Sequence, residues 1–157
     1  MNLVIDGHNL IPKIPGLNLS DLDDEPELVG MVQEYCRLKR CIAELFFDGG
    51  LPGFASPPTG GLVHVHVIQK SGTADEAMLA FLSRKGRAAH SYTLVSSDLH
   101  VQVQARSLGA AILSSDQFAR ELTAVLSRAD KSEHMEDKPL SPAEVDEWLK
   151  LFNSKKN

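Results

Sequence analysis

The chain has 157 residues, of which 43% are hydrophobic, and it carries a formal net charge of −5. This length and apolar content suffice for one sizeable core but are short for two, so we expect one domain with a tail. The apolar residues fall in short separate runs, none near the roughly 18 to 20 residues that cross a bilayer, which excludes a membrane span. The negative charge argues against a basic coat that binds nucleic acid without specificity.

The start of the chain looks like a first strand rather than a signal peptide, because an acid stands at position 6 and a glycine at position 7. We therefore expect a cytoplasmic protein. Cys36 and Cys41 are five residues apart in a segment that reads as helix, where their side chains would point to different faces. Neither a disulfide nor a metal pair is expected.

Five short apolar runs predict the strands of a sheet, and helical patterns between them have the spacing of crossover connections in a parallel sheet. The strands are expected at residues 2–6, 43–47, 63–68, 92–95 and 110–113, and the helices at about 27–41, 74–84, 99–107 and 116–127. This order predicts an α/β sandwich with helices on both faces of the sheet. Sites in such sheets form beyond the carboxyl ends of the strands.

The rest of the chain divides by composition. We expect a domain over residues 1–128, a polar linker over 129–140 and a helix over 141–157 that docks on the domain, because a capping box starts at Ser141 with Pro142 at the first helical position. Residues 51–61 are rich in proline and glycine and predict a loop that overhangs the site.

Four aspartates stand just past the ends of predicted strands or at helix starts: Asp6, Asp48, Asp75 and Asp98. Hard divalent cations such as Mg²⁺ and Mn²⁺ prefer carboxylate oxygens, and ions held in this way can activate water and stabilise charge on a phosphodiester. Taken singly, each aspartate is better explained as a helix cap or turn residue. Taken together, they predict a centre for phosphoryl hydrolysis.

Capping patterns help to separate these two explanations. Thr73 and Glu76 form a capping box that leaves Asp75 free and makes Glu76 a weaker ligand candidate. A second box over residues 114–117 assigns Asp116 to stabilising the helix dipole rather than to metal binding. No such box surrounds Asp98, which modestly favours a functional role over an ordinary N-cap.

The turn after Asp6 contains two further residues of interest. The Asn9 amide could hold a phosphate, a water or the neighbouring carboxylate, or it could simply stabilise the turn. We favour a functional role over a role in the turn alone. Gly7 would let the backbone turn tightly. His64 and His66 alternate along one strand; such a pair can bind zinc, but no further Cys or His stands at a supporting spacing, so a structural role is favoured.

Basic residues could form the local surface that holds an RNA backbone, although a solvated charged face fits them equally well. They are Arg37, Lys39, Arg40, Lys70, Arg84, Lys85 and Arg87. No P-loop, zinc ribbon, nucleophile elbow or dinucleotide fingerprint occurs, which disfavours those enzyme classes.

Four motifs together resemble the bacterial YacP-like branch of the NYN domains, which are ribonucleases with a PIN-like fold. They are Ile5-Asp6-Gly7-His8-Asn9-Leu10-Ile11, Phe47-Asp48-Gly49, Thr73-Ala74-Asp75-Glu76 and Ser96-Ser97-Asp98. The motifs occur in the family's order and cover roughly residues 2–127. One departure is His8, where the family more often has tyrosine.

The resemblance implies a PIN-like three-layer sandwich with a mainly parallel sheet, and an endoribonuclease that uses Mg²⁺ or Mn²⁺ in RNA decay or processing. The metal ligands would be Asp6, Asp75 and Asp98, with Asp48 a fourth acid and Asn9 orienting Asp6 or the substrate. Water would attack the phosphodiester in line and leave a 5′-phosphate and a 3′-hydroxyl. Expected substrate contacts are Arg37, Arg40, Lys70 and Ser97.

Two other classes of function compete with this one. The same fold could serve as a catalytically weak adaptor that binds RNA or the ribosome, and the four intact acids count against it. A phosphatase or phosphoacceptor domain would also place aspartates at strand ends. The run from Ile5 to His8 lacks the Asp-x-Asp pair of the first and the adjacent acids of the second. With a ribonuclease favoured over these classes, the expected partner is an mRNA or a structured RNA, and the ribosome is a further candidate.

Overall fold

A computed structural model describes residues 1–17, 24–48, 61–68 and 72–136. Within these residues, five strands form one sheet in the order β3-β2-β1-β4-β5, and every pairing is parallel. The strands are β1 (Asn2–Asp6), β2 (Ile42–Asp48), β3 (Val63–Ile68), β4 (Tyr92–Val95) and β5 (Ala111–Leu113). The predicted parallel sheet is confirmed, with nearly the same strand ends.

The four predicted helices are present, with a short fifth that the sequence did not reveal. They are α1 (Gly7–Leu10), α2 (Asp24–Lys39), α3 (Ala74–Lys85), α4 (Leu99–Ser107) and α5 (Ser115–Glu136), with 3-10 turns η1 (Ile11–Lys13) and η2 (Gly86–Ser91). Helix α1 has four residues, too few to leave a periodic apolar pattern. None of the described helices combines the length and apolar character needed to span a bilayer.

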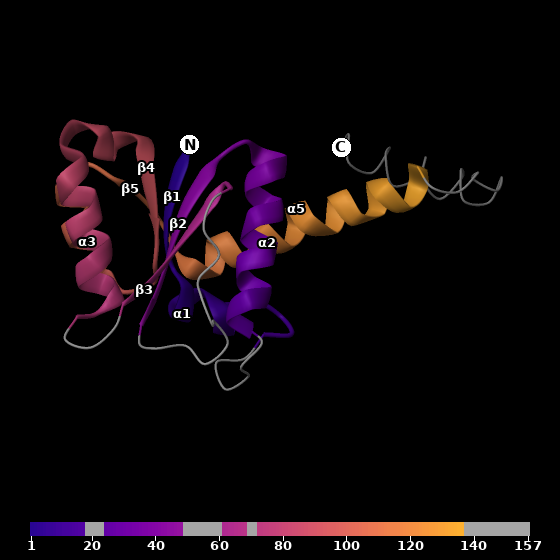
Figure 1. Ribbon diagram of the computed structural model, residues 1–157, viewed down its shortest axis with the longest axis horizontal. Coiled ribbons are helices and arrows are strands. Elements are labelled where there is room, and N and C mark those ends of the chain that lie inside the picture. The colour runs from indigo at the N-terminus through magenta and orange to yellow at the C-terminus, as the bar shows by residue number, and fades with distance from the viewer. Residues whose placement is uncertain (18–23, 49–60, 69–71, 137–157) are drawn as a thin grey trace. The chain divides into compact units, whose positions relative to one another are not determined.

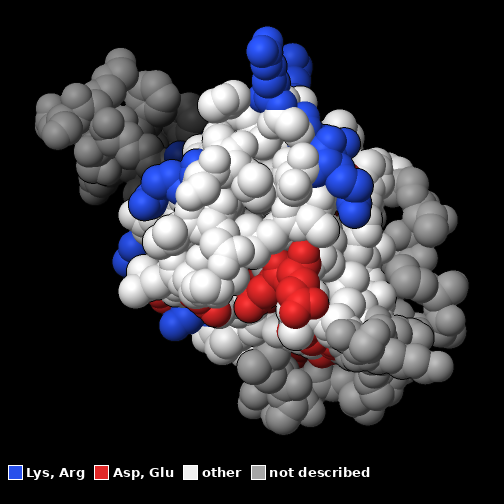
Figure 2. Space-filling view, turned by 90° about the vertical axis from the view of Figure 1, so that its left-hand side faces the viewer, with Lys and Arg blue, Asp and Glu red and all other residues white. Residues whose placement is uncertain are grey.

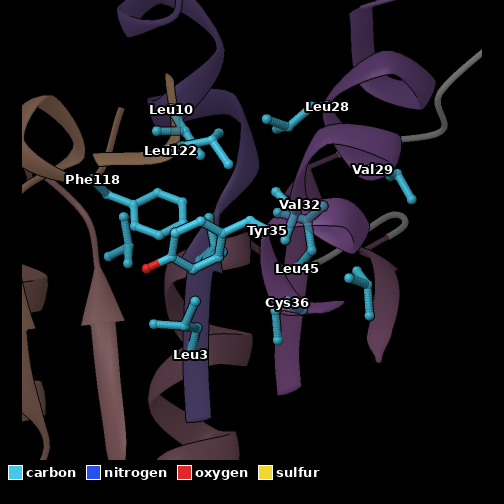
Figure 3. Packing of buried hydrophobic residues seen from close by; sticks show 14 of the residues in the cluster. Leu3, Leu10, Leu28, Val29, Val32, Tyr35, Cys36, Leu45, Phe118 and Leu122 are labelled. Atoms are coloured by element: carbon cyan, nitrogen blue, oxygen red, sulfur yellow. The ribbon is translucent and has the colours of Figure 1, made fainter. Parts of the chain in front are cut away.

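Two apolar cores lie on the two faces of the sheet, and α2 and α3 cover opposite faces (Figure 1). The first core joins β1 and β2 to α2 and to the start of α5. In it the Tyr35 and Phe118 rings meet edge to face with centroids 5.2 Å apart (Figure 3). The second core packs Val4 and Phe46 against Met78 of α3 and Val101 of α4. Both faces of the sheet are therefore covered at its centre, which explains the largely apolar runs of β1 and β2.

The sheet, helices α1 to α4 and the start of α5 belong to a compact unit over Met1–Leu126, and a second unit covers Ser127–Asn157. Helix α5 continues to Glu136, so residues 129–136, where we expected the first part of a polar linker, are helical. The rest of that linker and the expected helix over 141–157 lie outside the described residues, as does the 51–61 loop except for Gly61.

The two capping boxes expected from the sequence define helix starts. The Thr73 hydroxyl accepts a hydrogen bond from the Glu76 N–H at 3.1 Å and begins α3. At α5, the Ser114 hydroxyl accepts from the Gln117 N–H, and the Gln117 side-chain oxygen accepts from the Ser114 N–H. These bonds satisfy amides that have no partner within the helix.

The prediction that Cys36 and Cys41 face different directions is wrong. Helix α2 ends at Lys39, and Arg40 then adopts a left-handed φ of 54°. The Cys41 N–H returns to donate to the Cys36 carbonyl at 3.1 Å, and the two sulfur atoms lie 3.5 Å apart as buried free thiols. This is a Schellman ending, which brings the residue after the turn against the last helical turn.

His64 and His66 share one acidic partner. His64 Nδ1 lies 2.9 Å from one carboxylate oxygen of Glu44, and His66 Nε2 lies 2.7 Å from the other. Glu44 is buried on the neighbouring strand, and the His66 ring also stacks on Phe46. Since a buried carboxylate needs hydrogen-bond partners, these contacts support the structural role favoured for the two histidines.

Candidate active site

The four aspartates expected to form the site lie at the carboxyl edge of the sheet. Asp6 ends β1 and Asp48 ends the neighbouring strand β2, while Asp98 follows β4, which flanks β1 on its other side. Asp75 lies in the first turn of α3. Parallel strands bring their carboxyl ends to one edge, so acids that are far apart in the sequence become neighbours there.

Asp6 has the most unusual environment of the four. Asp6 is only 7% exposed, and the pKa of its carboxyl is raised from 3.8 to about 7, with burial as the largest cause. The negative charges of Asp75, Asp48 and Asp98 contribute to this rise, and a hydrogen bond from the Asn9 N–H opposes it. Such perturbed groups concentrate at functional sites.

Asp75 shares this electrostatic environment. Its pKa is raised by burial first and then by the charges of Asp98 and Asp48, whereas the nearby His100 and a hydrogen bond with Asp6 lower it. Figure 2 shows Asp and Glu side chains gathered in a patch, while most of the visible Lys and Arg side chains lie away from it. The four aspartates therefore form one acidic cluster.

Helix amides orient three of these carboxylates. One oxygen of Asp6 accepts from the Asn9 N–H at 3.3 Å, and one oxygen of Asp98 accepts from the His100 N–H at 2.9 Å. Asp48 accepts from the N–H of Ala74 at the start of α3. Asp98 is thus the N-cap of α4, and capping does not separate site residues from structural ones as the sequence suggested. Each of these bonds is accepted by one carboxylate oxygen, and Asp6 is also hydrogen-bonded to the Asp75 side chain.

Asp116, in contrast, lies outside this cluster. It is exposed in the first turn of α5, 3.6 Å from the Lys13 amine, in keeping with its assignment to the helix dipole. Glu76 is also exposed. His8 lies between the Phe47 ring, at a centroid distance of 5.3 Å, and the buried Glu25 carboxylate, at 3.6 Å.

Asn9 joins the carboxyl ends of three neighbouring strands. Its side-chain oxygen accepts from the Ser97 N–H at 2.9 Å and from the Ser115 hydroxyl at 2.6 Å. The Ser97 hydroxyl in turn accepts from the Ser115 N–H at 3.1 Å. Sequence reasoning missed Ser115, because within a capping box it is an ordinary first residue of a helix.

The basic residues expected to contact substrate do not all join the acids. Arg37 and Arg40 lie at the carboxyl end of α2, where the chain turns into β2, so they stand at the amino edge of the sheet. Arg37 also pairs with Glu34 there. Lys70 lies outside the described residues. Of the three expected substrate contacts that the structure describes, only Ser97 lies at the acidic cluster.

The acidic cluster has a donor set that suits a hard divalent cation, since carboxylate oxygens are the ligands that Mg²⁺ and Mn²⁺ prefer. No group of three or more His, Cys, Asp or Glu side chains within the described ranges is already arranged to hold a metal ion. Burial and the neighbouring aspartates raise the pKa of Asp6, so a cation bound beside it would stabilise its ionised form.

A three-layer α/β sandwich with an acidic cluster at the carboxyl edge of a parallel sheet is the architecture of the PIN-like nuclease folds. The YacP-like NYN domain model matches residues 3–153, and the chain belongs to that family. A comparison with curated proteins gives no match.

Two solved structures of Rae1 (YacP) from Bacillus subtilis share the fold. One matches with a TM-score of 0.73 and 23% identity, covering 99% of this chain and 94% of the other. A variant of the same protein matches with a TM-score of 0.72 and 20% identity, covering 94% of this chain and 89% of the other.

Proposed function

We propose that the protein is a metal-dependent endoribonuclease that hydrolyses RNA phosphodiester bonds. The observation that carries the proposal is the buried carboxyl of Asp6, whose pKa is about 7 among three other aspartates. Such an arrangement destabilises the fold in the absence of a cation, and proteins keep arrangements of this kind where function requires them. Membership of a family of nuclease-type domains supports the same assignment.

In this proposal Asp6, Asp75 and Asp98 hold the cation and Asp48 contributes charge beside them. The helix amides that bind one oxygen of Asp6 and of Asp98 limit rotation of those carboxylates and so would help to orient them for a cation. When bound, Mg²⁺ or Mn²⁺ would neutralise charge on the phosphate and lower the pKa of a water. Hydrolysis would leave a 5′-phosphate and a 3′-hydroxyl.

The substrate side of the site needs donors and positive charge to hold a polyanion. Ser97 and Lys70 remain our candidate contacts. Arg37 and Arg40 are no longer favoured, because they stand at the opposite edge of the sheet from the acids. With few described basic residues at the cluster, the cation would carry much of the electrostatic attraction for the phosphate.

A cleavage assay separates the enzyme from an adaptor that only binds RNA or the ribosome. Labelled RNA is incubated with the protein in Mn²⁺ or in EDTA, with and without ribosomes, and the product ends are mapped. We expect cleavage that requires Mn²⁺, leaves 5′-phosphates and is lost in Asp6→Asn. Asp116→Asn, which alters an exposed aspartate outside the cluster, is the matched control and should cleave normally.

The outcomes of this assay decide between the two functions. Cleavage only with ribosomes would retain the nuclease and add a required partner. Binding of RNA or ribosomes without any cleavage would favour the adaptor. Cleavage by Asp6→Asn at the parental rate would overturn the assignment of the site.

A further inference from the structure

Asn9 is held at its oxygen by two residues from other strand ends. The donor at Ser97 is a backbone N–H, 2.9 Å from the Asn9 side chain. A backbone N–H can only donate, so the Asn9 atom that faces it must be the oxygen. The Ser115 hydroxyl, 2.6 Å from the same oxygen, must then donate as well. The orientation of the Asn9 amide is therefore fixed.

Among the described residues, this orientation leaves the amide nitrogen of Asn9 without a partner. Oxygen and nitrogen lie on opposite sides of the planar amide, so Nδ2 points away from Ser97 and Ser115. It makes no hydrogen bond to the described residues and is not enclosed by them. The link between Asn9 and Asp6 runs through the Asn9 backbone N–H instead. The side chain of Asn9 thus presents two unused donors within three residues of Asp6.

Donors are scarce where four carboxylates gather, and an incoming phosphodiester brings further negative charge. A donor fixed in advance stabilises such charge better than one that must reorient during the reaction. Ser115 is fully buried, and its hydroxyl and N–H bind Asn9 and Ser97 respectively, so it can hold this arrangement rigidly.

Resting on the proposed function, we propose that Ser115 is a positioning residue that acts through Asn9. It holds the Asn9 amide so that Nδ2 donates to a non-bridging oxygen of the scissile phosphodiester. Asn9 then contacts the substrate, whereas Ser115 does not.

A double-mutant cycle tests this chain of action. Cleavage of RNA in Mn²⁺ is measured for Asn9→Ala, Ser115→Ala and the double variant, and kcat and KM are separated. Loss of one such donor lowers kcat by about 10² to 10³. We expect that effect for Asn9→Ala, about a tenfold loss for Ser115→Ala, and a double variant no worse than Asn9→Ala. Ser115→Thr, which keeps the hydroxyl, should restore most of the rate lost in Ser115→Ala.

Ser114→Ala is the matched control, because Ser114 caps the same helix but bonds Gln117 rather than Asn9. It should lower the melting temperature and leave kcat nearly unchanged. Multiplicative losses in the double variant, or an equal loss of kcat in Ser114→Ala, would overturn the role of Ser115.

The two proposals fail in distinguishable ways. If the wild-type protein does not cleave RNA, the proposed function fails, and the cycle is then measured as affinity for the same RNA. Weaker binding in Asn9→Ala, with no further loss in the double variant, would still support the Ser115 proposal. Unchanged affinity in all three variants would overturn it.

Discussion

Asp6 illustrates how one side chain can serve a site at the expense of the fold. The folded protein keeps its carboxyl protonated up to a pH of about 7, whereas an unfolded chain releases that proton near 3.8. Between these values the folded state binds the extra proton. Stability contributed by this group is therefore present at low pH and falls as the pH rises toward 7.

Asp6→Asn should consequently stabilise the protein at neutral pH. The amide has nearly the same shape but no charge to bury among the other acids. We expect a gain of roughly 2 to 4 kcal/mol at pH 8 and little change at pH 4. Urea unfolding at both pH values measures this difference, with Asp116→Asn as the control. A variant no more stable than the parent at pH 8 would contradict the raised pKa.

Gly7 serves the site in a way that the sequence did not suggest. Its φ is not positive, so a tight turn is not the reason for glycine. A Cβ there would instead collide with the buried Phe47 ring, whose Cδ1 would lie 2.6 Å away. Glycine is needed at this position for space.

Gly7→Ala should therefore destabilise the protein by about 1 to 3 kcal/mol, as overpacking does in cores. Gly30→Ala is the matched control, because a Cβ at this exposed position in α2 meets nothing within 4 Å. It should stabilise the protein by about 0.5 to 1 kcal/mol, since alanine favours helix. Equal effects of the two substitutions on chemical denaturation would show that the contact with Phe47 is unimportant.

At the scale of elements, the site is built from helix starts. Asp6, Asp48 and Asp98 each accept a hydrogen bond from an amide at the start of a helix. The positive end of a helix stabilises a nearby carboxylate, which partly offsets repulsion among the acids. Capping and metal binding are therefore two uses of the same side chain.

Asp98 allows these two uses to be separated. Asparagine caps helices about as well as aspartate, but its uncharged amide oxygen binds a hard cation more weakly than a carboxylate does. Asp98→Asn should keep the melting temperature of the parent but lose cleavage. Asp98→Ala should lose cleavage and also melt at a lower temperature, because the lost cap contributes about 1 kcal/mol to the free energy of unfolding. Thermal unfolding and RNA cleavage of the two variants provide the test. Full activity in Asp98→Asn would remove Asp98 from the proposed metal ligands.

At the scale of the whole molecule, local patterns predicted the sheet because its inner strands β1 and β2 are buried along most of their length and so appear as largely apolar runs. The meeting of Asp6, Asp48 and Asp98 followed from the rule that parallel strands end at one edge. The same rule should have excluded Arg37 and Arg40 from the site. A crossover helix starts near the carboxyl edge of the sheet and ends at the amino edge, where these two residues lie.

Other features depend on contacts that no local pattern records. The hydrogen bond between Ser115 and Asn9 joins residues 106 positions apart, and the identity of neither residue predicts it. The approach of Cys36 and Cys41 depended on where α2 stops, and only the left-handed Arg40 determines that. The general position of the site could thus be predicted, but not the network that orients it.

Calorimetric titration with Mn²⁺ at pH 8 most directly tests the claim that the acidic cluster is a metal centre. The wild-type protein and Asp116→Asn should bind Mn²⁺ with equal affinity, and Asp6→Asn should bind at least about tenfold more weakly, as expected when a ligand carboxylate is lost. Equal affinity of Asp6→Asn and the wild-type protein, or no binding by either, would contradict the account.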